Sequence, residues 1–346
     1  GAIVVTATEG RPKPSSDAGD IELLLSRFRT AAELAAEPVP ETRWRIGRLF
    51  PEVALVQVTG APKGGGKSTF LIHAIQALLS GIPFLGEETL PCPVVYLTEQ
   101  GRDSFEPEYL TPAGLMGSPD LHILYGYQTS GCAWETVVEA AVEKCIRTGA
   151  KLLVVDTFSH FARLQGDREN SSGYILAALR PLQDAKDTHG LCIVAIHHDR
   201  KSGGEVWDSG RGGNAFAAAV DVIINLRRPT TNEQNTIREI RAEGRYTDLY
   251  DSLFVELTDK GYVAHGSAPD VAREKAARAV LDTAPTSEAD ALPIGDLLQE
   301  VQKEHPDMAR TTLQRAIETH LNHGTLRCRG AGKRGDPYRY FLPLEE

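Results

Sequence analysis

Residues 61–69 read Ala61-Pro62-Lys63-Gly64-Gly65-Gly66-Lys67-Ser68-Thr69, and they decide the fold predicted for this chain. The apolar run at residues 53–58 is typical of a buried strand, and the apolar run at residues 70–79 predicts a helix. A glycine-rich turn between a strand and a helix is the setting in which such a stretch binds phosphate. Its glycines let successive backbone N–H groups converge on a polyanion, and the helix N-terminus adds partial positive charge. The stretch therefore predicts a site for a nucleoside triphosphate.

The residues of this loop have distinct expected roles. All nine are expected to surround the phosphates of ATP, with Lys67 reaching the β- and γ-phosphates and the Ser68 hydroxyl binding Mg²⁺. The strict pattern, G-x-x-x-x-G-K-[ST], has glycine where this chain has Ala61. A related pattern with a second lysine, K-G-G-x-G-K-[ST]-T, does not fit, because one residue is missing between Lys63 and Lys67. An ordinary glycine-rich turn is the alternative interpretation.

Two further apolar runs end in carboxylates. Residues 151–156 end in Asp156, and residues 93–99 end in Glu99. Ligands bind at the carboxyl ends of parallel strands, so Asp156 is expected to reach the magnesium ion through water. Glu99, beside the γ-phosphate, is expected to orient and partly deprotonate the attacking water. The alternatives are that Asp156 only caps the turn that follows it and that Glu99 is only solvated.

Composition limits the class of protein. The chain has 346 residues, 41% of them hydrophobic and 24% charged, which is enough for about two domains. Its five cysteines lack C-x-x-C spacing, so neither a disulfide framework nor a zinc site is indicated, and a reducing cytoplasm is expected. No apolar run is long enough to span a bilayer, so no membrane association is expected. A net charge of −10 argues against indiscriminate coating of nucleic acid but allows local basic patches.

Patterning along the chain predicts four parts. Residues 1–20 resemble a flexible tail, and residues 21–39 contain an amphipathic helix that packs locally or docks on a neighbouring subunit. Residues 40–266 alternate strand-like and helical runs, which predicts an α/β fold with a mostly parallel sheet flanked by helices. Residues 267–346 predict three helices followed by a hairpin, the outline of a small winged helix domain.

The predicted winged helix domain is locally basic on an otherwise acidic chain. Its third helix and its hairpin interleave cations with Tyr338 and Tyr340, which suits contact with DNA phosphates and grooves. Winged helices also dock proteins, and a solvated wing is a further alternative. The expected DNA contacts in this part are Arg310, Arg315, Arg327, Arg329, Lys333 and Arg334.

The order of the loop and the two acid-tipped strands resembles that of the RecA-like ATPase core. Within that group the chain resembles the RepA-type hexameric replicative helicases of plasmids and their bacterial relatives. The resemblance covers about residues 40–266 and rests on five segments, residues 61–69, 96–99, 154–161, 193–198 and 216–227.

The resemblance implies further roles by position. His197 and His198 occupy the place of a polar sensor that reports the γ-phosphate to the nucleic-acid-binding loops. Residues 199–213 are similar to the mobile loop that faces the channel of a ring, with Lys201 and Arg211 as DNA contacts. Arg241 and Arg245 fall near the residues that reach the ATP of the neighbouring subunit, with Arg245 slightly favoured. Each of these residues could instead have an ordinary structural or solvated role.

The sequence as a whole favours a Mg-ATP-dependent DNA helicase. Its expected cofactors are ATP and Mg²⁺, and its expected partners are DNA, further copies of itself in a hexameric ring, and other replication proteins. The alternative is a non-translocating ATP switch that controls DNA loading for a mobile element. A recombinase-like filament fits the predicted core but not the predicted tail.

Overall fold

The computed structural model describes residues 17–39, 41–62, 65–164, 166, 168, 171–198, 214–229 and 236–343. Four residues of the predicted sites therefore lie outside the described residues: Lys63, Gly64, Lys201 and Arg211. Contacts divide the chain into two units, Gly1–Thr42 and Arg43–Glu346.

The first unit contains two short helices where the sequence predicts one helix within residues 21–39. They are α1, Asp17–Leu25, and α2, Ala31–Ala35. Thr30 sets the start of α2, because its side chain accepts from Glu33 N while Glu33 Oε2 accepts from Thr30 N, a reciprocal cap that fixes a new helix start. The large apolar side chains that the structure describes in this unit are exposed, among them Ile21, Leu25 and Phe28.

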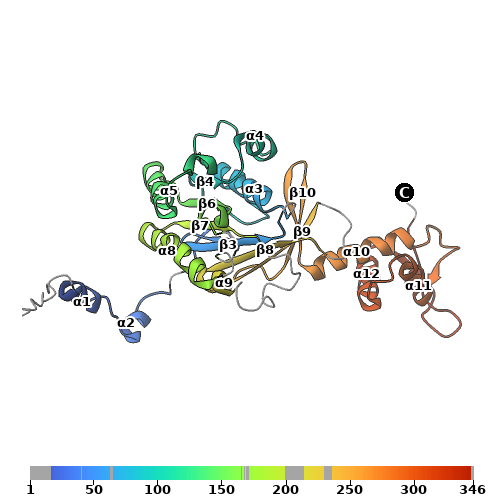
Figure 1. The fold of residues 1–346 in the computed structure, drawn as a ribbon. Coiled ribbons are helices and arrows are strands. Elements are labelled where there is room, and N and C mark those ends of the chain that lie inside the picture. Colours follow the sequence, from blue (N-terminus) through green and yellow to red (C-terminus); the bar gives the residue numbers. More distant parts are fainter. Residues whose placement is uncertain are drawn as a thin grey trace, which may run out of the picture. The chain divides into compact units, whose positions relative to one another are not determined.

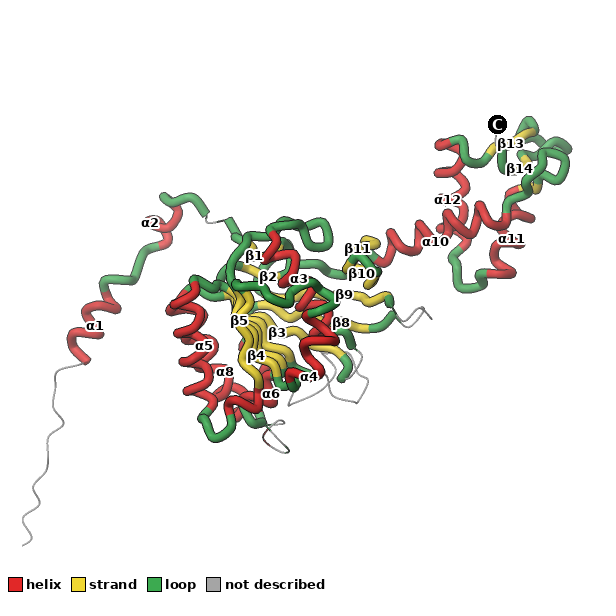
Figure 2. The backbone as a smooth tube through the Cα atoms, turned by 90° about the horizontal axis from the view of Figure 1, so that it is seen from above, coloured by secondary structure: helices red, strands yellow, loops and turns green. Residues whose placement is uncertain are grey.

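The second unit is built on a large sheet, shown in Figures 1 and 2. Within the described residues it has nine strands in the order β11-β10-β9-β8-β3-β7-β6-β4-β5. From β8 through β5 all neighbouring strands are parallel, whereas β9, β10 and β11 are antiparallel to their neighbours. The bounds are β3 Ala54–Gly60, β4 Val94–Thr98, β5 Leu121–Tyr125, β6 Leu152–Asp156, β7 Cys192–Ile196, β8 Val222–Arg227, β9 Ile237–Gly244, β10 Leu253–Thr258 and β11 Gly261–Gly266.

The central strands are buried on both faces because their apolar side chains alternate between two cores. On β3, Ala54, Val56 and Val58 belong to one hydrophobic cluster and Leu55 to the other. The same alternation holds on β6, where Leu152 and Val154 face the first cluster. Continuous apolar runs are what a parallel sheet between two helical layers requires. The prediction of a mostly parallel, helix-flanked α/β sheet, as in a RecA-like core, is therefore confirmed.

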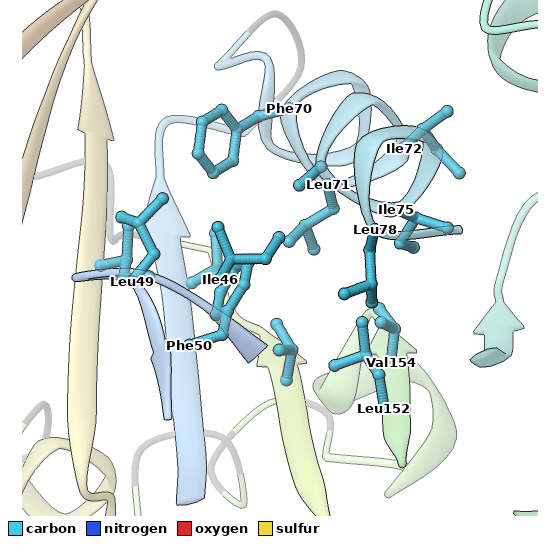
Figure 3. Packing of buried hydrophobic residues seen from close by; sticks show 14 of the residues in the cluster. Ile46, Leu49, Phe50, Phe70, Leu71, Ile72, Ile75, Leu78, Leu152 and Val154 are labelled. Carbon is cyan, nitrogen blue, oxygen red and sulfur yellow. The ribbon is translucent and has the colours of Figure 1, made fainter. Parts of the chain in front are cut away.

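Helices cover both faces of the sheet (Figure 2). The first cluster contains α3, Lys67–Ser80, whose Phe70, Leu71 and Leu78 pack onto the sheet together with Ile46 of β1, as Figure 3 shows. The second cluster contains the buried faces of four helices. These are α5 Trp134–Thr148, α6 Phe158–Phe161, α8 Ser172–His189 and α9 Asn214–Ala219.

Short elements complete the region around the sheet. β1, Trp44–Ile46, and β2, Phe50–Pro51, form an antiparallel pair. A π-helix, η1 Glu106–Leu110, follows α4 Arg102–Phe105, and a 3₁₀ helix, η2 Gly126–Thr129, follows β5. No helix of the described residues combines the length and the apolar character that crossing a membrane demands.

The C-terminal residues form helices and a small sheet around a hydrophobic cluster of their own, which includes Leu297, Leu313 and Ile317. The three predicted helices are present as α10 Ala268–Thr283, α11 Ile294–Glu304 and α12 Arg310–His323. The predicted hairpin is present as β13 Arg327–Arg329 and β14 Arg339–Phe341, and β14 also pairs with β12, Leu292–Pro293. Its assignment as a winged helix domain stays a prediction.

Candidate nucleotide-binding site

The predicted phosphate loop leaves the end of β3 and enters α3 as expected. Gly66 caps α3 with a φ of 82°, a left-handed conformation that favours glycine. A Cβ on Gly65 would lie 2.5 Å from the backbone oxygen of Ala61, so the close turn of the loop requires glycine there too. The ammonium group of Lys67 donates to the carbonyls of Gly60 and Ala61, at 2.9 and 2.8 Å. Lys67 is therefore held at the mouth of the loop.

The two predicted carboxylates lie at the same edge of the sheet as this loop. β4 and β6 are neighbours, and Thr98 is paired with Asp156 in their register. The backbone N–H of Glu99, one residue further, donates to the Asp156 carbonyl at 2.7 Å. Because β6 and β3 both flank β7, the parallel strands deliver Asp156, Glu99 and the loop to one edge.

Asp156 is held by two hydroxyl groups. Ser68 Oγ and the Tyr96 hydroxyl each donate to Asp156 Oδ2 at 2.7 Å. Asp156 is only 3% exposed, and burial raises the pKa of its carboxyl, while the bonds from Ser68 and Tyr96 oppose that shift. Burial also raises the pKa of the Tyr96 hydroxyl, to which the nearby Asp156 charge adds. Tyr96 therefore remains a proton donor to Asp156 at neutral pH.

The side chains that meet here fit a magnesium ion. Mg²⁺ prefers oxygen ligands and is commonly bound through one or two protein oxygens together with substrate phosphates. Ser68 and Asp156 supply a hydroxyl and a carboxylate that already touch one another beside Lys67. Both residues line the same cavity as the loop.

Glu99 is contacted by side chains of Thr157, which directly follows β6, and of α6. Thr157 Oγ1 donates to Glu99 Oε2 at 2.7 Å, and His160 Nδ1 lies 3.7 Å from the same oxygen. The Glu99 side chain is about one-third exposed and lines the cavity, so it can reach a water molecule there. This geometry satisfies the positional requirement for a general base.

One cavity of about 770 Å³ contains these groups. One wall carries Glu99, Gln100, Tyr109, Asp156, Thr157 and His198, and the loop side contributes Pro62 and Gly65 to Thr69. The other wall carries Arg228, Thr236, Arg238, Leu257 and Tyr262. Leu257 and Tyr262 are cross-strand partners in the β10–β11 hairpin. The acids come from the carboxyl ends of β4 and β6, whereas the apolar and cationic second wall comes from the part of the chain between the end of β8 and β11.

Sequence reasoning missed the residues of that second wall. Arg238 is the clearest case, since the resemblance to hexameric helicases points instead to Arg241 on the same strand and to Arg245 directly after it. Arg238 shares a strand face with Ile240 and Ala242, both buried in the first cluster. The signal that could have identified Arg238 is its spacing, because a cation two residues before Ile240 and four before Ala242 shares their strand face. Tyr262 carries no such signal, because its neighbours Phe70 and Phe84 come from distant segments.

The two predicted sensor histidines are placed differently. His198 lines the cavity. His197 points to the other side of β7's end, where its Nδ1 lies 3.2 Å from Ser159 Oγ and its ring stacks on Phe216. The pair is thus divided between the cavity and the contact with α9.

The two predicted trans-acting arginines lie outside the cavity and are engaged within their own chain. Arg241 donates to Glu239 at 2.8 Å, and Arg245 donates to Asp221 at 2.8 Å. Asp221 directly precedes β8 and accepts from Leu55 N near the start of β3, so Arg245 lies at the sheet edge opposite the phosphate loop. The structure does not bring these arginines together with the loop of the same chain.

The predicted DNA contacts of the C-terminal part are all exposed or partly exposed. Arg310 and Arg315 lie on α12, Arg327 and Arg329 on β13, and Lys333 and Arg334 in the turn before β14.

Comparisons with known proteins identify a matching family and a similar solved structure. Residues 22–204 match the family described as AAA domain, which is just over half of the chain. No curated protein matches the chain. Among solved structures, the chain is similar to a KaiC-like protein, PH0186, from Pyrococcus horikoshii OT3. That similarity has 15% sequence identity and a TM-score of 0.48, and it covers 65% of this chain and 99% of the other.

Proposed function

This chain belongs to the AAA domain family and is a P-loop ATPase, and on that premise we propose that it is a Mg-ATP-dependent motor that acts on DNA, as a replicative helicase of a plasmid or mobile element does. The observation that supports hydrolysis is the meeting of Lys67, Asp156 and Glu99 in one cavity at the carboxyl edge of the sheet.

The chain's own residues divide the work of hydrolysis. The loop N–H groups and Lys67 bind the phosphates, and Ser68 and Asp156 would hold the magnesium ion. The ion, when bound, neutralises charge on the β- and γ-phosphates. Glu99, held by Thr157, takes a proton from water while the water oxygen bonds to the γ-phosphorus. The bond from that phosphorus to the bridging oxygen breaks, which gives ADP and inorganic phosphate.

Contact with DNA is assigned to the C-terminal part. Its cations on α12, β13 and the following turn suit phosphate contact, and a winged helix there would place α12 in a groove. The double variant Arg327→Gln, Arg329→Gln should therefore weaken DNA binding about equally for all DNA sequences. It should also reduce the slope of log K against log salt concentration by roughly 2. Arg278→Gln, at an exposed position on α10, serves as the matched control.

Assembly into a hexameric ring is part of the proposal. In a ring, Arg241 or Arg245 could reach the ATP of the adjacent subunit only by leaving its ion pair with Glu239 or Asp221. A cytoplasmic setting with other replication proteins as partners completes the proposed context.

Strand displacement on a forked duplex tests the motor. The unchanged chain should separate the strands only with Mg-ATP, and Lys67→Ala should abolish both hydrolysis and displacement. Hydrolysis without displacement would overturn the motor. That result would favour a non-translocating switch. The supporting observation is the separate hydrophobic cluster of the C-terminal part, because a self-contained DNA-binding part can be controlled without translocation.

A further inference from the structure

Arg238 is a charged side chain on the buried face of a strand. It is only 8% exposed, and its neighbours on that face of β9, Ile240 and Ala242, belong to the core that packs under α3. Charged groups are rarely buried at such positions unless they bind a counter-charge or serve a site. The next arginine on the strand, Arg241, lies on the opposite face and is more exposed, with its head group on Glu239.

The Arg238 guanidinium reaches the phosphate loop of its own chain. Its Nε donates to the Gly65 carbonyl at 3.3 Å, and a Cβ on Gly66 would lie 3.5 Å from the same nitrogen. Its Nη1 donates to the Ile237 carbonyl at 2.8 Å. Gly65 and Gly66 immediately precede Lys67, so the guanidinium lies beside the turn that is expected to surround the phosphates. Arg238 also lines the cavity with Lys67.

The charges around Arg238 favour an anion. Burial lowers the pKa of Arg238, and the positive charge of Arg228, another residue of the same wall, lowers it further. A guanidinium nevertheless stays protonated at neutral pH. Two arginines and Lys67 therefore bring positive charge to the cavity that also holds Asp156 and Glu99. A polyphosphate pairs with such cations while it offers oxygens to planar N–H donors.

We propose that Arg238 is a second phosphate-binding cation of this nucleotide site, contributed in cis by the chain that also contributes Lys67. This inference rests on the proposed function, because it requires that the cavity bind a nucleoside triphosphate. The phosphate site would then be formed by residues of both the loop and β9.

Binding of Mg-ATP, measured by calorimetry, tests the role. Arg238→Gln keeps an amide donor for the Gly65 carbonyl but removes the charge, and we expect it to weaken binding by about tenfold to a hundredfold, as loss of a charge-assisted hydrogen bond does. Arg238→Ala should weaken binding at least as much. Arg180→Gln, an exposed arginine on α8 in an i,i+4 pair with Asp184, should bind as the unchanged chain does.

Two results would overturn the inference while leaving the proposed function standing. One is that Arg238→Gln binds Mg-ATP within twofold of the unchanged chain, which would leave Arg238 as a tether of the loop. The other is that mixing Lys67→Ala with Arg238→Ala restores hydrolysis, since only a trans-acting arginine could complement. If the unchanged chain does not bind Mg-ATP, that result would instead contradict both the proposed function and this inference.

Discussion

The Tyr96 hydroxyl donates a hydrogen bond of 2.7 Å to Oδ2 of Asp156 on the adjacent strand. This bond stabilises the charged form of the buried Asp156 carboxylate. Ser68, at the end of the phosphate loop, donates a second bond to the same oxygen. Asp156, the acid proposed to bind magnesium, is therefore oriented from two different elements of the fold.

Tyr96→Phe removes that bond without changing the shape of the core. We expect the free energy of unfolding to fall by about 1–2 kcal/mol and the Mg²⁺ concentration for half-maximal hydrolysis to rise several-fold, because Asp156 loses a donor that favours its charged form. Urea denaturation and a magnesium titration of the ATPase rate measure the two effects. Tyr174→Phe, at an exposed tyrosine of α8, is the control. An unchanged magnesium requirement would contradict the prediction.

Asp156→Asn should stabilise the chain at neutral pH while it abolishes magnesium-dependent nucleotide binding. The raised pKa means that folded Asp156 holds its proton more tightly than the unfolded chain does. Its contribution to stability is therefore fully present below the ordinary pKa of 3.8 and is lost as pH rises through the raised value. Asparagine avoids that loss, and its carbonyl can accept from both Ser68 and Tyr96.

Urea denaturation without nucleotide, at pH 7 and at pH 4, measures this effect. The gain should be about 1 kcal/mol at pH 7 and should be smaller at the lower pH, because the native carboxyl takes up its proton as the pH falls through its raised pKa. Asp184→Asn, at an exposed position on α8, should show no such pH-dependent gain. A variant less stable than the unchanged chain at pH 7 would show that the Asp156 charge is stabilising.

Glu99→Gln should separate binding from hydrolysis. The amide oxygen can still accept from Thr157, so the side chain keeps its place, but it can no longer take a proton. Single-turnover hydrolysis should slow by roughly 10²–10⁴-fold, the usual contribution of a general base, while Mg-ATP affinity stays within twofold. Hydrolysis within tenfold of the unchanged rate would mean that another group activates the water.

Gly65→Ala should disrupt the phosphate loop. The added Cβ would meet the Ala61 backbone oxygen at 2.5 Å, so the loop must open to accept it. Strain of this kind costs about 1–3 kcal/mol, which corresponds to a loss of roughly tenfold to a hundredfold in Mg-ATP affinity. Gly173→Ala on α8 is the matched control, since no atom lies within 4 Å of its added Cβ. Equal affinities of the two variants would argue against a rigid loop.

Local patterns are enough to predict most of the core and half of the site. The apolar runs before the loop and before Asp156 form β3 and β6, and the run before Glu99 forms β4. Their carboxyl ends lie at one edge of the sheet because parallel strands share one direction. The order along the chain, first the phosphate loop and then two strands that each end in an acid, is typical of such a parallel sheet. The phosphate loop and both acids can therefore be placed together from the amino-acid sequence alone.

The other half of the site depends on pairings between distant segments. Arg238 reaches Gly65 only because β9 lies beside β8, and β8 beside β3. The resemblance to hexameric helicases favours Arg245 over Arg241 as a trans-acting residue. The ion pair of Arg245 with Asp221, however, is set by the register of β8 against β9, in which Val222 faces Gly244. No local pattern contains that register, so strand neighbours decide which arginine lies beside the phosphate loop.

The placement of β3 between β7 and β8 also bears on how the chain is made. Ala54 pairs with Cys192 and Val56 with Val222, so both partners of the central strand are synthesised long after it. Until residue 222 has left the ribosome, β3 is an apolar strand with at least one open edge, which other chains can join. The phosphate loop therefore follows a strand whose two neighbours are both completed only late in translation.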